Sequence, residues 1–141
     1  MTDEGGEAAC WAHLFDDDSS SGEAVDLAPL LAAAHDADGV QWSLADSADL
    51  NVNLVRLGAG GTIARHVNAE VDVAVIVLAG TGTLHVDRVT HALAPQVVAH
   101  IPKGAARAIQ AGPDGLAYLT VHRRRGALGI APRAARGEVR S

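Results

Sequence analysis

The sequence predicts an all-β fold, an antiparallel sandwich or barrel, formed by a single domain. Between residues 40 and 122, short segments rich in Val, Ile, Leu and Thr follow one another. Gly, Pro and Asp residues separate these segments, and no helical pattern interrupts them. The chain has 141 residues, of which 48% are hydrophobic, a size and composition that suit one domain with tails.

One short helix is expected before the strands, from Asp26 to His35. Asp26 suits the N-cap position, Pro29 is tolerated in the first turn, and Gly39 is a stop signal. Leucine and alanine side chains recur on one face of this segment, so we expect the helix to pack against the outside of the barrel.

The strands are expected in a regular series. Leu50–Leu57 alternates clearly between polar and apolar residues. Turns are expected at Gly80-Thr-Gly82 and at Asp87-Arg88. Residues 71–78 are apolar on both faces, so their pattern does not indicate which face points into the barrel. The expected strands are 41–45, 50–57, 62–68, 71–78, 82–86, 90–93, 97–101, 105–110 and 116–122.

The two ends of the chain carry opposite charge. Residues 1–26 hold eight acidic residues and no Lys or Arg, whereas residues 123–141 hold six arginines. We expect a flexible acidic segment at 1–25, the barrel domain at 26–122 and an Arg-rich tail at 123–141.

Composition restricts the partners. No apolar run approaches the roughly 20 residues that cross a membrane. The aromatic content of 3% argues against a nucleic-acid stacking surface, and Cys10, the single cysteine, allows no disulfide framework. We therefore expect a cytoplasmic protein with no membrane or nucleic-acid partner. A homodimer is expected because the apolar residues around Trp11 and the free strand edges need cover.

A polar ladder directly before an apolar strand marks the expected site. The side chains of His66, Asn68, Glu70 and Asp72 alternate along the chain immediately before the apolar run that ends at Gly80. Polar groups close to a core need hydrogen-bonding partners. A binding or catalytic function is therefore expected at this stretch.

Residues 50–121 resemble the cupin superfamily. The first motif of that family, Gly-x5-His-x-His-x4-Glu-x6-Gly, is matched in spacing by Gly60, His66, Asn68 and Gly80. In the second motif, Pro102-Lys-Gly104 fits the Pro-x-Gly sequence. The resemblance implies a double-stranded β-helix, a jelly-roll barrel. It also implies a small-molecule site inside the barrel, which in many members holds a metal ion through three histidines and one glutamate.

The chain departs from that ligand pattern. His66 is in place, but Asn68, Val73 and Arg107 stand where the second His, the Glu and the third His belong. Arginine is always charged and repels a cation, but it grips a carboxylate through two parallel hydrogen bonds. We therefore expect His66, Asn68 and Arg107 to bind a small acidic ligand, with no metal cofactor.

A rearranged metal site is the alternative. Glu70 and Asp72 lie near the family's Glu position, and a register slip of one residue would turn Asp72 inward. His100 and His122 are further donors from separate strands. The protein would then be a dioxygenase, isomerase or hydrolase that uses Fe, Mn, Ni or Zn. The ligands would come from the set His66, Asn68, Glu70, Asp72 and His100.

A third interpretation makes His66 a neutral core histidine bonded to a backbone carbonyl.

Overall fold

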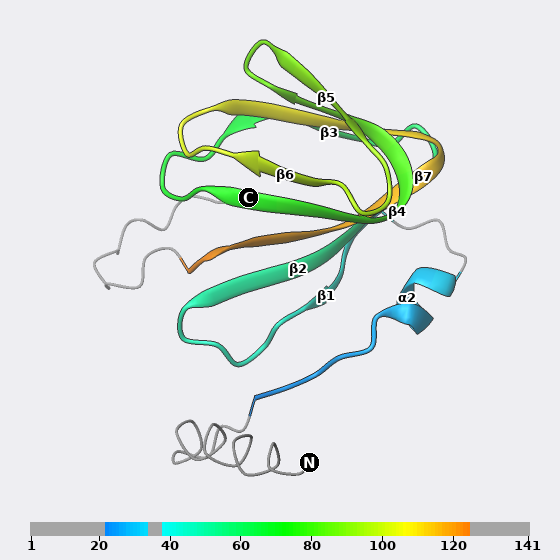
Figure 1. Cartoon of the computed structure of the whole chain (residues 1–141), viewed down its shortest axis with the longest axis vertical. Coiled ribbons are helices and arrows are strands. Elements are labelled where there is room, and N and C mark those ends of the chain that lie inside the picture. The colour runs from blue at the N-terminus through cyan, green and yellow to red at the C-terminus, as the bar shows by residue number, and fades with distance from the viewer. Residues whose placement is uncertain (1–21, 34–37, 125–141) are drawn as a thin grey trace, which may run out of the picture.

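The computed structural model describes residues 22–33 and 38–124. The elements are α2 (Ala28–Ala32), β1 (Gly39–Ser43), β2 (Leu50–Leu57), β3 (Thr62–Val67), β4 (Val73–Val86), β5 (Val89–Leu93), β6 (Val98–Ile101) and β7 (Ala106–Arg123). Every strand pair among them is antiparallel (Figure 1). The predicted all-β antiparallel fold is therefore confirmed. The acidic segment up to residue 21 and the Arg-rich tail from residue 125 lie outside the described residues.

The two long strands β4 and β7 each run through both sides of the barrel. The first half of β4 pairs with the second half of β7, as at Ala74 and Val121. The second half of β4 pairs with the first half of β7, as at Val86 and Arg107. The first half of β7 also pairs with β3, and its second half pairs with β2. One strand therefore contributes to two facing walls of the barrel. We call them the Arg107 wall (β3 and residues 106–111) and the Thr120 wall (β2 and residues 116–123).

The glycines at 80 and 82 bend β4 and do not end it. The prediction of a turn at this point was wrong, because residues 73–86 form one strand whose register on β7 shifts near Gly80. Gly80 has φ +81° and Gly115 of β7 has φ +80°, values that glycine adopts without steric cost. The two strands bend together at these glycines, and the bend brings the walls face to face.

The core lies between the walls. Along β4, the side chains of Val73, Val75 and Val77 are buried, with 3%, 1% and 1% of their surface exposed. The intervening Ala74 and Ile76 are half-buried on the outer face. This settles the orientation that the apolar pattern on both faces had left open.

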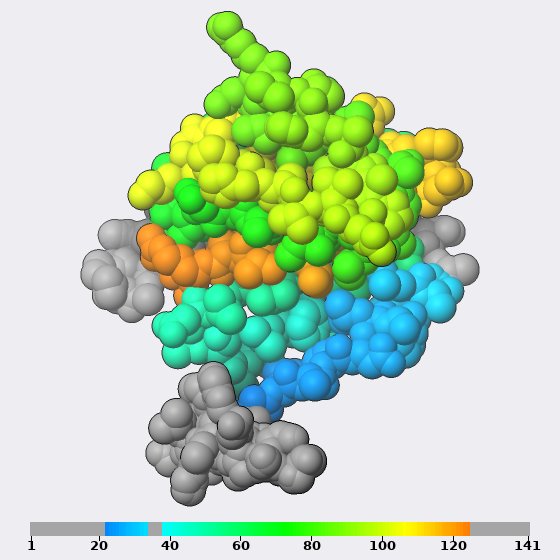
Figure 2. All heavy atoms as spheres, viewed as in Figure 1, coloured from blue at the N-terminus to red at the C-terminus, as the bar shows by residue number. Residues whose placement is uncertain are grey.

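The short helix is confirmed, and its bounds are corrected. Leu27 is the N-cap residue, and Asp26 acts one position earlier, where its Oδ1 accepts a hydrogen bond of 3.0 Å from the backbone N–H of Ala28. Arg56 of β2 donates from Nη2 to the carbonyl oxygens of Leu30 and Leu31, at 3.3 and 2.9 Å. These bonds hold α2 against the outside of β2, where Figure 2 shows it in blue. The helix ends at Ala32, and Ala33 is extended, so the expected end at His35 was too late.

One further turn fits its sequence, and a second places a glutamine in a conformation more typical of glycine. Asp87 and Arg88 form the predicted turn between β4 and β5, and Val86 pairs with Val89. Gln96, shortly before β6, has φ +79°, a conformation that glycine adopts without steric cost. Within residues 22–33 and 38–124, no helix has the length and apolar character needed to cross a membrane.

Candidate functional site

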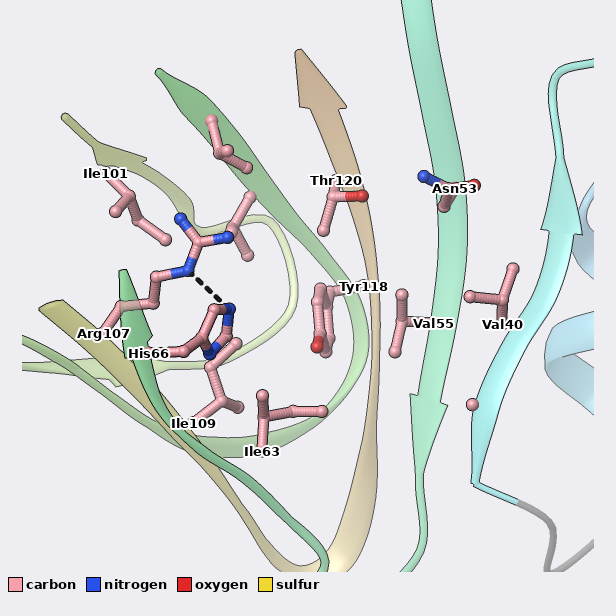
Figure 3. Close-up of a pocket in the computed structure, with 13 residues that line it drawn as sticks. Val40, Asn53, Val55, Ile63, His66, Ile101, Arg107, Ile109, Tyr118 and Thr120 are labelled. Carbon is pink, nitrogen blue, oxygen red and sulfur yellow. Dashed lines mark hydrogen bonds between the residues drawn. The ribbon is translucent and has the colours of Figure 1, made fainter. Parts of the chain in front are cut away.

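A cavity of about 290 Å³ lies between the Arg107 wall and the Thr120 wall. Its lining combines many aliphatic side chains with a few polar ones (Figure 3). The lining residues are Gly39, Val40, Asn53, Val55, Ile63, His66, Val73, Val75, Ile101, Arg107, Ile109, Tyr118 and Thr120. Val40 belongs to the edge strand β1 and is 59% exposed, so the cavity reaches the surface beside β1.

Arg107 and His66 form a hydrogen-bonded pair in this cavity. They are register partners on β7 and β3, and Arg107 is 5% exposed. Arg107 Nε donates to His66 Nε2 at 3.0 Å, the dashed line in Figure 3. His66 Nδ1 lies 2.8 Å from the carbonyl oxygen of Ala64. Because a carbonyl only accepts, Nδ1 carries the proton and Nε2 is the acceptor, so His66 is neutral here and fixes the guanidinium.

Asn68 is placed differently from the other two predicted ligand-binding residues. It is 7% exposed and is not among the residues that line the cavity. Its Oδ1 accepts hydrogen bonds from the backbone N–H groups of Glu70 and Val71, at 2.9 and 3.4 Å. An asparagine that bonds to the backbone two residues ahead stabilises a turn. Asn68 therefore shapes the connection between β3 and β4.

Three donors of the alternative metal site, Glu70, Asp72 and His100, lie on the outer surface. His100 Nε2 is 3.1 Å from Asp72 Oδ2, with side chains 64% and 59% exposed, and Asp72 Oδ1 accepts from the backbone N–H of Lys103 at 2.9 Å. The Lys103 N–H and then the His100 imidazole hold the pKa of Asp72 below its ordinary value. Glu70 is exposed as well. The register slip that would turn Asp72 inward does not occur, because Val73 takes the inward position.

No protein-family model matches the chain, and a comparison with curated proteins gives no match. Solved structures do match it. A conserved double-stranded β-helix protein from Klebsiella pneumoniae is 16% identical, with a TM-score of 0.62 over 75% of this chain and 94% of that one. A cupin superfamily protein from Desulfitobacterium hafniense is 22% identical, with a TM-score of 0.60 over 72% and 90%. This chain has the cupin fold. A conserved protein of unknown function from Streptococcus pyogenes, 23% identical, matches 73% of this chain and 88% of its own with a TM-score of 0.60.

The cupin metal positions can now be compared with the side chains present. Three of the four, held here by His66, Val73 and Arg107, line the cavity. The fourth, Asn68, lies in the turn. Valine is no ligand, and a guanidinium repels a cation. Within the described ranges, no three His, Cys, Asp or Glu side chains gather so that they could hold a metal ion. His122 is buried and lies outside the lining, with Nδ1 2.8 Å from the carbonyl oxygen of Arg123. The residues do not fit the four-ligand metal site of metal-binding cupins.

Tyr118 is a site residue that the sequence did not single out. It lines the cavity of the cupin barrel and is 3% exposed. Burial raises the pKa of Tyr118 to about 12, and the positive charge of Arg107 opposes this increase. Its phenol therefore stays neutral at ordinary pH and can donate or accept a hydrogen bond. The one signal in the sequence was a tyrosine in an otherwise aliphatic stretch, and it is the only tyrosine of the chain.

Ionisation of Tyr118 is expected to destabilise the folded protein above pH 10. The pKa is 10.0 in the unfolded chain and about 12 in the folded one. The stabilisation is therefore complete below pH 10 and is lost as the pH rises to 12. The loss amounts to about 2–3 kcal/mol. Because no other tyrosine is present, ultraviolet absorbance of tyrosinate measures this group directly, and denaturation of Tyr118→Phe shows how much of the pH dependence remains. Ionisation near pH 10 in the folded protein would contradict the prediction.

Proposed function

We propose that this protein binds a small organic anion inside its barrel, with Arg107 as the main anion-binding residue and no metal ion of the usual cupin kind. Such a protein would act as a sensor, a carrier or a structural partner. The observation that supports the proposal is the Arg107 guanidinium itself, 5% exposed in the wall of a largely aliphatic cavity and oriented by a bond to neutral His66.

The chemistry of this arrangement favours carboxylates. A guanidinium is planar and can present two parallel N–H donors to the two oxygens of one carboxylate. Apolar walls lower the local dielectric, so the attraction is stronger than on the surface. Salt screens buried pairs less than exposed ones, so affinity for a carboxylate should change little between low and moderate ionic strength.

Calorimetry with matched acids and amides tests the proposal. We expect a straight-chain carboxylate such as hexanoate to bind with a stoichiometry of one per chain, whereas hexanamide, similar in size but uncharged, binds far more weakly. Titration with Mn, Fe, Ni and Zn is expected to give no tight site. Stoichiometric metal, found by elemental analysis of protein purified without an affinity tag, would contradict the proposal, as would equal affinity for the acid and the amide.

We also propose that the protein is a homodimer. In the described part of the chain, β1, β3, β5 and β6 each pair on one side alone. Each of these edge strands carries an exposed valine, namely Val40, Val67, Val89 and Val98. Strand edges with exposed apolar side chains favour association. Light scattering should give twice the chain mass, and a monomer over a wide concentration range would contradict the proposal.

A further inference from the structure

The walls of the cavity restrict the kind of anion that fits. Of the residues that line it, Arg107 supplies the permanent charge, and seven others are Val or Ile. The volume of about 290 Å³ is at the lower end of the range of about 300–1,000 Å³ that is typical of ligand pockets. The cavity therefore suits a small molecule with one anionic group and an apolar body.

Apart from the phenol of Tyr118, the polar groups of the cavity lie at two separate places. Arg107 and His66 belong to the Arg107 wall, whereas Thr120 and Asn53 belong to the opposite wall, where they are register partners on β7 and β2. Figure 3 shows Tyr118 between His66 and the strand that carries Asn53, with Ile109 and Ile63 below His66 in the view. Apart from the phenol of Tyr118, a ligand held at Arg107 would therefore meet aliphatic and aromatic surface before it reaches the hydroxyl of Thr120 or the amide of Asn53.

From this arrangement we infer that the ligand is a small monocarboxylic acid with an apolar body, whose far end bears a hydrogen or a single hydroxyl group. The inference rests on the proposed function and specifies the class of ligand that the same site binds. The carboxylate binds at Arg107, the body lies against the valines and isoleucines, and a terminal hydroxyl bonds to Thr120.

Other classes of acid are disfavoured by the same walls. A second carboxylate would lie against Val and Ile side chains, Thr120 and Asn53, none of which is a cation, and burial of a charge without a cation is costly. A polyhydroxylated acid would leave several hydroxyl groups against aliphatic walls without partners. Both classes should therefore bind more weakly than a simple apolar acid of equal length.

Calorimetry with straight-chain acids from butanoate to decanoate tests the apolar body. Each methylene that enters the cavity should strengthen binding about fourfold, until the cavity is full and the affinity levels off. Adipate, the dicarboxylate of the same length as hexanoate, should bind about 100-fold more weakly than hexanoate because its second charge is buried.

Variants at Thr120 test the far end. The test compares two acids of the chain length that binds best, one with a terminal hydroxyl and its unsubstituted parent. When Thr120→Val removes the hydrogen-bonding partner, the affinity of the hydroxylated acid relative to the parent should fall about three- to tenfold. The matched control is Thr62→Val, at an exposed position on β3 outside the cavity. It should leave the ratio of the two affinities at the value of the unmodified protein.

The outcomes separate this inference from the proposed function. If no carboxylate binds, both are wrong. If carboxylates bind but affinity does not rise with chain length, or adipate equals hexanoate, the inference is wrong while anion binding stands. If Thr120→Val and Thr62→Val change the ratio of the two affinities equally, the placement of the ligand's far end at Thr120 is wrong.

Discussion

Replacement of Gly80 with alanine is expected to destabilise the barrel by about 3–5 kcal/mol. An added Cβ would overlap the carbonyl oxygen of Gly115 and lie 2.9 Å from the Cα of Leu116. Both obstacles are backbone, so no change of rotamer relieves them. Gly80 also has φ +81°, which costs a residue with a side chain about 1–2 kcal/mol. Since a domain is stable by only about 5–15 kcal/mol, this change should remove a large share of the free energy of unfolding.

Gly104→Ala is the matched control for this change. Gly104 has φ +88°, but nothing lies within 4 Å of the added Cβ. Gly104→Ala should therefore lower the free energy of unfolding only through the unfavourable positive φ, by about 1–2 kcal/mol. Urea denaturation of the unmodified protein and both variants gives the free energy of unfolding for each. Equal losses in the two variants would show that the close approach of β4 and β7 at Gly80 does not stabilise the fold as described.

The position of Gly80 also explains which parts of the fold could be predicted. β2 was predicted with its bounds correct, because alternation of polar and apolar residues is a local property of the strand. The bend in β4 could not be distinguished from a turn. Glycine permits both, and the choice is made by β7, more than thirty residues later, which bends at the same place and continues the pairing.

The sequence predicted two residues of the cavity, His66 and Arg107, but not the residues around them. The motif spacing indicated His66 and Arg107, and the structure brings both into the cavity. Asn68 has the spacing of a ligand, but the competing preference of asparagine for turns decides its place. Thr120 and Asn53 were missed because their contribution depends on a wall formed by two strands far apart in sequence. Whether these residues bind a ligand stays a prediction.

Replacement of Arg107 with methionine is expected to weaken carboxylate binding by about 2–5 kcal/mol, which is about 30-fold or more. Methionine is apolar and flexible, so it fills space near His66 without a charge or a donor. Arg107→Lys keeps the charge but lacks the planar pair of donors, so we expect an intermediate loss. Arg65→Met is the control, because Arg65 is exposed on the same strand as His66 and is not among the cavity residues.

The variants of His66 complete this test. His66→Gln keeps an acceptor for Arg107 Nε, whereas His66→Leu removes it. The loss of affinity for hexanoate should therefore be larger with leucine than with glutamine. Both losses should be smaller than the loss caused by Arg107→Met. The alternative of a metal enzyme predicts the opposite order. In that case loss of His66 abolishes function, and Arg107→His restores a ligand and raises the affinity for Mn, Fe, Ni or Zn. Calorimetry on the full set, with acids and with metals, therefore decides whether the guanidinium or the imidazole is the principal binding group of this barrel.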